Sequence, residues 1–228
     1  MTRQEMRAPH LDARLAAAAA YVRPGSAAAD VGCDHGKLAA YLAASGRCPR
    51  VIASDVRAQP LARARALCAQ LGVQALVDCR LGDGLSVLRP GEVQDIVIAG
   101  VSGVTAAQML AGAPFAFEKG TRCIFVPPTK HGVLRAHLAQ SGFALVDETP
   151  VLAAGRVYTV LCAEYTGEAR QPGLYECAVG KAEKRTEAAA AYLARVAALT
   201  EKYARGAEDS ETYLALARQV KEAAQRCL

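Results

Sequence analysis

The chain has 228 residues, 52% of them hydrophobic, and a net charge of +5. This length can bury one domain-sized core with residues left for a small appendage. Eight cysteines are scattered without a CxxC pair, and the apolar run LAAAAAYV is too short to span a bilayer, so we expect a cytoplasmic protein without disulfides, metal or membrane anchor. The mild positive charge permits an anionic partner such as RNA without requiring one.

Apolar strand-like runs alternate with helical patterns after an N-terminal helix over Arg14–Tyr21, which predicts an α/β fold with an open parallel sheet. The predicted strands are Ala27–Val31, Val51–Ser54, Gln74–Cys79, Asp95–Ala99 and Cys123–Val126. The predicted helices between them are Lys37–Ala44, Pro60–Leu71, Thr105–Ala111 and Leu134–Gln140.

The end of the predicted sheet differs from its start. Residues Gly142–Tyr165 hold two strand-like runs around a turn at Ala153–Arg156, with no room for a crossover helix, so these strands should pair antiparallel. A parallel sheet closed by an antiparallel pair is typical of the Rossmann-like class I S-adenosylmethionine (SAM) methyltransferase fold, whereas NAD-binding domains finish with parallel strands. The pattern therefore favours SAM over NAD for a domain over residues 1–168.

A linker at Thr166–Gly173 precedes a region without strand signals, and residues 174–228 predict a helical hairpin, or coiled coil. Asp209 or Ser210 in the turn RGAEDS can cap its second helix. The hairpin either only packs on the main domain or another subunit, or helps to hold a large substrate. Its apolar stripes are Ala189, Tyr192, Val196, Leu199 and Tyr203, then Tyr213, Leu216, Val220, Ala223 and Cys227. Its candidate RNA-binding cations are Lys181, Lys184, Arg185, Arg195, Lys202 and Arg205.

The stretch ADVGCDHGKLAAYLAASG, Ala29–Gly46, indicates a strand, a glycine turn and a helix. Asp34 stands where a dinucleotide-binding turn would have its second glycine. SAM carries a sulfonium and an ammonium but no pyrophosphate, so a SAM-binding turn needs glycine and can use carboxylates. Asp30 and Gly32 form a D-x-G arrangement, in which Asp30 either faces the cationic tail or caps a turn. Asp34 either caps the following helix or faces the methyl group, and His35 is either a ligand or a loop residue.

Further acids follow the next strands. Asp55, followed by Val56, ends the second strand, where an acid can accept both ribose hydroxyls; the alternative is an exposed acid without a role. Asp83, followed by Gly84, either accepts a bond from the adenine amino group or belongs to a plain turn. Gly100, in IAGVSG after the fourth strand, lies where the acceptor would meet the methyl group.

The series LDARL, ADVGCDHGKLAAYL, RLGDGL, DIVIAG and LRAHLAQSGFALVDE, followed by the hairpin, resembles the bacterial tRNA (adenine-N1)-methyltransferase family that modifies adenine 22 in the D-arm. The resemblance runs from about Leu11 to Tyr165, and the tail fits that family's coiled-coil domain. It implies an enzyme with SAM as cofactor and tRNA as partner. The sequence does not give the oligomeric state, for which we expect a monomer. The turn and the resemblance together predict a cofactor-binding set of Arg14, Asp30, Gly32, Asp34, His35, Asp55, Val56, Asp83, Gly84 and Gly100.

The implied reaction is direct in-line transfer, because adenine N1 has a lone pair and needs no prior deprotonation. Asp34 is the predicted catalytic residue, since its charge can stabilise the cation that forms on the ring. The base must be unpaired to enter the site. Two segments depart from the family: IAGVSG stands where relatives have IAGMGG, and VPP, Val126–Pro128, where they have QPN. A SAM methyltransferase with another acceptor, and a nonenzymatic SAM- or RNA-binding protein, are therefore alternative hypotheses.

Overall fold

The structure is a computed structural model that describes residues 8–228, so the first seven residues of the predicted 1–168 domain lie outside the described part. The strands are β1 (Ala28–Val31), β2 (Val51–Asp55), β3 (Val77–Leu81), β4 (Asp95–Ala99), β5 (Arg122–Val126), β6 (Phe143–Ala153) and β7 (Arg156–Tyr165). The helices among them are α1 (Ala13–Tyr21), α2 (Lys37–Ala44), α3 (Ala58–Gln70), α4 (Gly103–Ala111) and α5 (His131–Gln140), with short 3₁₀ turns at Gly84–Val87 and Pro114–Ala116.

All the strands form one sheet in the order β3-β2-β1-β4-β5-β7-β6. The first five strands pair in parallel, and β7 lies antiparallel between β5 and β6. Ala154 and Gly155 join β6 to β7, both with positive φ, which matches the twist of a tight hairpin. The predicted closure of a parallel sheet by an antiparallel pair is confirmed.

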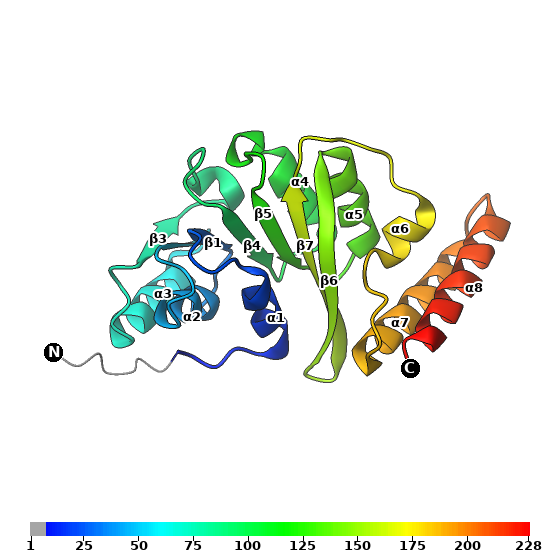
Figure 1. Cartoon of the computed structure of the whole chain (residues 1–228), viewed down its shortest axis with the longest axis horizontal. Coiled ribbons are helices and arrows are strands. Elements are labelled where there is room, and N and C mark those ends of the chain that lie inside the picture. Colours follow the sequence, from blue (N-terminus) through cyan, green and yellow to red (C-terminus); the bar gives the residue numbers. More distant parts are fainter. Residues whose placement is uncertain (1–7) are drawn as a thin grey trace.

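Helices cover both faces of the sheet (Figure 1). One apolar cluster packs α1, α2 and α3 against one face, and a second packs α4 and α5 against the other. The β1 and β2 strands are buried throughout, as expected for central parallel strands that are covered on both sides. Between residues 8 and 228, no helix is long and apolar enough to cross a membrane.

The third strand begins later than predicted. Residues 74–76 form a turn, in which the Leu76 N–H donates to the Val73 carbonyl at 2.9 Å, and pairing with β2 starts at Val77 opposite Val51. The strand lies in the predicted region of the chain, but the residue at which it begins depends on its pairing with β2, which is distant in sequence.

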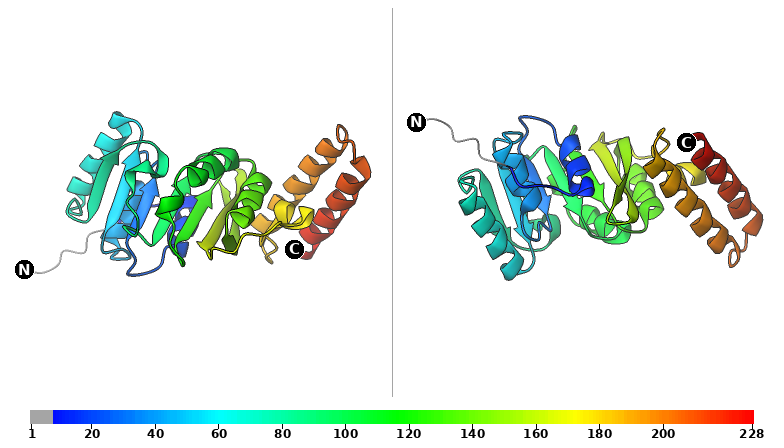
Figure 2. Two further views of the ribbon diagram at one scale, coloured as in Figure 1. Left: turned by 90° about the horizontal axis from the view of Figure 1, so that it is seen from above. Right: turned by 90° about the horizontal axis from the view of Figure 1, so that it is seen from below.

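The C-terminal part consists of α6 (Leu174–Val179), α7 (Glu187–Ala204) and α8 (Ser210–Arg226). The α7 and α8 helices pack together as the predicted hairpin, and Asp209 caps α8 by accepting the Thr212 N–H at 3.1 Å. The hairpin stands at the β6 edge of the sheet, at one end of an elongated molecule (Figure 2).

The apolar stripe predicted for α8 is buried except for the half-exposed Tyr213, but the stripe predicted for α7 is partly wrong. Leu199 and Tyr203 are exposed, while Ala197 and Thr200 take the buried side. Apolar residues occupy two sides of α7, so their spacing alone selects the wrong side near the tip.

A buried ionic network fixes the hairpin to the sheet domain. The Arg135 side chain on α5 is 2% exposed and donates to the Glu148 carboxylate of β6 at 2.9 Å and to the Tyr192 hydroxyl of α7 at 2.8 Å. Its other terminal nitrogen donates to the carbonyls of Cys177 and Ala178 at the end of α6. One guanidinium therefore joins α5, β6, α6 and α7.

Candidate cofactor site

A cavity of about 280 Å³ opens where β1, β4 and β5 end and where α1 and α2 begin. The carboxyl ends of parallel strands meet at one edge of a sheet, which is why turns far apart in sequence converge there. Its lining consists of Asp12, Arg14, Leu15, Asp30, Gly32, Cys33, Asp34, His35, Lys37, Leu38, Ala99, Gly100 and Val126. The structure thus brings together Arg14, Asp30, Gly32, Asp34, His35 and Gly100 of the predicted set.

The glycine turn is held by backbone contacts. The N–H groups of Gly32 and Cys33 both donate to the Ser54 carbonyl, at 2.9 and 2.8 Å. Gly32 has φ +74° with open space beside it, so the backbone conformation requires glycine there and leaves the surface accessible. Gly36 is restricted to glycine for a different reason, because an added Cβ would lie 2.5 Å from the Cβ of Ala64 on α3.

Asp34 does not cap α2, so that alternative is wrong. The N-cap position belongs to Gly36, and the first-turn N–H of Ala39 donates to Asp30 rather than to Asp34. The Asp34 carboxylate is instead 60% exposed at the cavity, with His35 Nε2 at 3.6 Å and Arg57 Nη2 at 3.8 Å. Its φ of +50° is a conformation that Asp and Asn tolerate better than most residues. Asp34 therefore presents a solvent-accessible negative charge to the cavity.

Asp30 is a buried carboxyl beside the same cavity. Its Oδ2 accepts the Ala39 N–H at 3.2 Å. Burial is the main cause that raises the pKa of Asp30 to about 7; the bond from the Ala39 N–H opposes this shift, and the nearby Asp55 carboxylate adds to it. A cation that entered the cavity would favour the charged form of this group.

His35 contributes an unsatisfied polar atom. Its Nδ1 is buried and has no hydrogen-bond partner within residues 8–228. Buried polar atoms are rarely left unpaired, so this nitrogen offers a bond to a ligand. Together with the acidic groups Asp30 and Asp34, it fits a cofactor that carries cationic groups and polar hydroxyls, which is the donor and charge pattern of SAM.

Asp55 and Val56 do not line the cavity, although Asp55 supports its wall. The Asp55 carboxylate is buried beneath the turn and accepts the N–H of Asp34 at 3.1 Å and that of Arg57 at 2.9 Å. The alternative of an exposed acid without a role is therefore wrong. Val56 is exposed beside it. Contact of either residue with a ribose stays a prediction.

Asp83 and Gly84 lie after β3, also outside the cavity lining. Asp83 is exposed at the start of a 3₁₀ turn, and its carbonyl accepts the Ser86 hydroxyl at 2.5 Å. Gly84 has φ +54°. A role in binding adenine stays a prediction, and the plain turn stays the alternative.

The structure adds Asp12 to the wall of the cavity. Its carboxylate caps α1 by accepting the N–H groups of Arg14 and Leu15, both at 3.0 Å, and it pairs with the Arg14 guanidinium at 2.7 Å. Arg14 also lies over the Tyr158 ring, 4.8 Å from its centroid. The motif LDARL contains this cap, because an acid directly before an apolar helix is a typical N-cap signal.

Both segments that depart from the family lie beside the cavity, and each precedes a helix: VSG leads directly into α4, and VPP ends two residues before the N-cap of α5. Ser102 caps α4 by accepting the Thr105 N–H at 3.1 Å. In VPP, Val126 lines the cavity, while the carbonyl of Pro127 bonds His131 Nε2 at 3.0 Å. Burial lowers the pKa of His131 to about 4, so its ring is neutral near pH 7.

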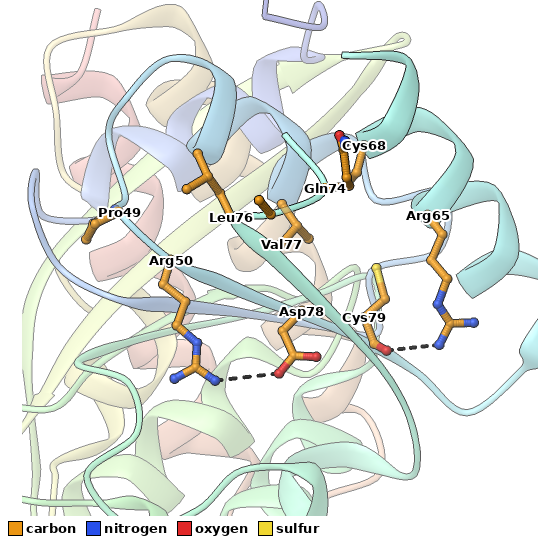
Figure 3. A pocket seen from close by; sticks show the side chains of 10 residues that line it. Pro49, Arg50, Arg65, Cys68, Gln74, Leu76, Val77, Asp78 and Cys79 are labelled. Atoms are coloured by element: carbon orange, nitrogen blue, oxygen red, sulfur yellow. Dashed lines mark hydrogen bonds and ion pairs between the residues drawn. The ribbon is translucent and has the colours of Figure 1, made fainter. Parts of the chain in front are cut away.

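A second hollow of about 620 Å³ lies at the β3 edge of the sheet (Figure 3). Arg50 faces Asp78 there at 3.5 Å, and Arg65 donates to the Cys79 carbonyl at 2.9 Å. Its lining, taken from the described residues, includes none of the predicted site residues. Over the same part of the chain, no three His, Cys, Asp or Glu side chains are grouped to hold a metal ion.

A parallel sheet closed by an antiparallel pair, with an acidic glycine turn at the end of β1, defines the class I methyltransferase fold. Residues 11–161 match the family model described as "Methyltransferase domain". The chain belongs to this methyltransferase family.

The curated relative is the tRNA (adenine(22)-N(1))-methyltransferase of Bacillus subtilis (strain 168), 32% identical over 155 residues, which are 68% of this chain. The chain spans 65% of that relative's length. Among solved structures, the B. subtilis M1A22 tRNA methyltransferase TrmK has a TM-score of 0.80 at 24% identity, covering 96% of this chain and 98% of that chain. TrmK of M. capricolum, in complex with S-adenosyl-homocysteine, has a TM-score of 0.76 at 18% identity, covering 95% and 97%. These likenesses show that the fold, hairpin included, is shared over nearly all of the described residues.

Proposed function

We propose that the chain is a SAM-dependent methyltransferase that acts on N1 of adenine 22 in tRNA. The observation that carries this proposal is the acidic turn, in which buried Asp30 and exposed Asp34 flank one cavity of a methyltransferase fold. The curated relative has this activity in its name, and the similarity extends to the hairpin in the solved structures. We place the enzyme in the cytoplasm as a monomer, with residues 1–168 as the SAM-binding unit and 174–228 as the arm.

Different residues of the site would contact different parts of the cofactor. Asp30 would pair with the ammonium of the SAM tail, because its buried carboxyl gains most from a cationic partner. His35 Nδ1 would supply a hydrogen bond, and the open backbone at Gly32 would allow close approach. Asp55 would reach the ribose from below the turn, while Asp83 would lie towards the adenine. SAM supplies the activated methyl group.

The chain's own part in the chemistry is alignment and charge. Adenine N1 attacks with its lone pair, so no protein base has to remove a proton first. As the N–C bond forms, the bond between the methyl group and sulfur breaks and its electron pair stays on sulfur, so the positive charge moves to the ring, where the Asp34 carboxylate at the cavity would stabilise it. Ala99 and Val126 supply apolar wall at the ends of β4 and β5.

The target base has to leave its base pair before N1 can enter the cavity. We propose that the hairpin grips the tRNA during this step. Lys184 pairs with Asp147, while Lys181 and Arg195 donate to strand carbonyls, so these three contribute less than predicted. The remaining predicted cations, which are exposed in the described part of the chain and therefore accessible to a phosphate, are Arg185, Lys202 and Arg205.

The direct test is transfer from tritiated SAM to an unmodified tRNA transcript, followed by identification of the modified nucleoside. We expect N1-methyladenosine, and a transcript with guanine at position 22 should accept no label. Label that persists in the guanine transcript would refute the assigned target.

A methyltransferase with another acceptor is the second candidate, because VPP places Val126 and no side-chain amide in the cavity wall beside Gly100. Methylation of a different nucleoside in the same assay would favour this candidate. SAM binding without any transfer would favour the nonenzymatic alternative.

A further inference from the structure

A large apolar groove lies between the hairpin and the sheet domain, outside the cofactor cavity. This groove, which we call the hairpin groove, has a volume of about 600 Å³ and runs between the start of α5, α6 and the outer half of the hairpin. Figure 2 shows the hairpin diverging from the sheet domain towards its tip. Four large apolar side chains that are exposed to solvent line it: Val133, Leu174, Leu199 and Tyr203. Such clustered exposure marks an interaction surface.

The chemistry of the groove suits a nucleobase. Tyr203 is 58% exposed, and the Lys130 ammonium lies 3.3 Å from its hydroxyl and 5.8 Å from its ring centroid. Tyr213 supplies a second aromatic ring. None of the described lining residues is acidic, and Lys202 and Arg205 flank Tyr203 in the sequence as exposed cations. Aromatic rings beside cations are the usual means of binding unpaired nucleotides.

The groove is also within reach of the cofactor cavity. Val126 lines the cavity and Lys130 lines the groove, and the four residue steps between them span at most about 14 Å. Stacked nucleotides rise about 3.4 Å each, so this span corresponds to about four nucleotides or fewer. One RNA strand can therefore occupy both places.

We propose that the hairpin groove binds an unpaired tRNA base close in sequence to the target adenine, stacked on Tyr203, with Lys130 beside the adjacent phosphate. The site rests on the proposed function only in taking tRNA as its ligand. It explains why apolar side chains remain exposed on the face of α7 that turns towards the sheet domain, where the sequence pattern predicts them to be buried.

The absence of tryptophan from the chain allows a direct test. The substitution Tyr203→Trp gives a single tryptophan, in the groove, that can be excited selectively over the tyrosines, and Phe115→Trp gives a matched exposed control outside it. Titration with unmodified tRNA transcript should quench the Tyr203→Trp emission by stacking and leave the Phe115→Trp emission unchanged. Equal responses of the two variants would overturn the proposal.

Affinity measurements distinguish the contribution of the Tyr203 ring to tRNA binding from that of the Lys130 charge. Tyr203→Ala should weaken tRNA binding about tenfold, while Tyr203→Phe stays within about twofold and the control Leu214→Ala, on the hairpin outside the groove, is unaffected. Tyr203→Ala should leave the salt dependence unchanged, whereas Lys130→Asn should lower the slope of log K against log salt by about one. Asn tolerates the positive φ of Lys130, so the turn should persist.

Methyl transfer by the unsubstituted protein distinguishes this proposal from the proposed function. If tRNA is methylated but Tyr203→Ala binds it normally, the groove proposal fails and the function stands. If tRNA quenches Tyr203→Trp although no methyl is transferred, the groove proposal stands and the function fails.

Discussion

Asp30 is a buried carboxyl beside the cavity, so its charge responds to a cation that fills the cavity. Its pKa of about 7 in the folded chain, against an ordinary value of 3.8, means that the folded state holds a proton that the unfolded state has lost between about pH 4 and pH 7. Stability contributed by this group is therefore present below pH 4 and is lost as the pH rises through 7. A cofactor ammonium would reverse this cost, which couples SAM binding to proton release.

Asp30→Asn should make the free protein more stable at pH 8 and weaken SAM binding. Asn retains the bond from the Ala39 N–H and cannot ionise, so the gain in unfolding free energy should be on the order of 2–4 kcal/mol at pH 8 and vanish near pH 4. Urea unfolding across this pH range measures the gain, and calorimetry measures the affinity. A gain that is equal at both pH values would contradict the titration of Asp30.

Asp34→Asn separates a catalytic charge from a structural role. The Asp34 side chain caps no helix, and Asn accepts the positive φ, so the melting temperature should stay within about 1–2 °C. The rate of methyl transfer should fall by about 10² or more, the scale for losing one electrostatic stabiliser. Single-turnover transfer at saturating SAM and tRNA measures this chemical step. A rate near that of the unsubstituted enzyme would reduce Asp34 to a turn residue.

At the scale of elements, the buried pair of Arg135 and Glu148 joins α5 and β6 to the hairpin. Arg135→Met should lower the free energy of unfolding by about 3–5 kcal/mol, because the Glu148 carboxyl stays buried without its partner. The exposed pair of Arg170 and Glu176 offers a control, and Arg170→Met should cost about 1 kcal/mol or less. Chemical denaturation measures both values.

A second substitution tests whether the unpaired Glu148 carboxyl causes this loss of stability. Combining Arg135→Met with Glu148→Leu should recover much of the lost stability, because the uncompensated carboxyl is removed. No recovery in the double variant would mean that the bonds from Arg135 to Tyr192 and to the α6 carbonyls dominate.

In the whole molecule, buried hydrogen bonds join the arm to the sheet domain. Charge substitutions on the arm therefore test its role in tRNA binding better than removal of the arm does. Deleting residues 175–228 would strip Arg135 of its bonds to Tyr192, Cys177 and Ala178, and the remaining domain would lose stability as well as its arm.

Replacing Lys202 and Arg205 with Gln should weaken tRNA binding and lower the salt slope by about two, since each phosphate contact contributes about one. Replacing Lys221 and Arg226, which pair with Glu201 and Glu183, is the matched control. Filter binding across a salt series measures the slopes, and equal slopes in the two variants would argue against the hairpin tip as the phosphate-binding part.

The alternation of strands and helices, the antiparallel end of the sheet and the order of strand, turn and helix around Gly32 could all be predicted from the sequence alone. These features are local: strand and helix periods differ, two adjacent strand-like runs leave no room for a crossover, and Gly32 has to adopt a positive φ. The predicted cluster of Asp30, Asp34 and Gly100 also followed, because the ends of parallel strands always share one edge.

The partner that each side chain meets depends on how distant segments pack together and could not be predicted from the sequence. The backbone N–H of Asp34 donates to the Asp55 carboxylate, 21 positions away in sequence, and Arg135 donates to the Tyr192 hydroxyl across 57 positions. The same reason explains the shifted start of β3, which is set by β2, and the exposed Leu199 and Tyr203, whose helix buries its other side. Spacing within a segment reports which side chains share a face, whereas the choice of face depends on the surface that another segment brings to it.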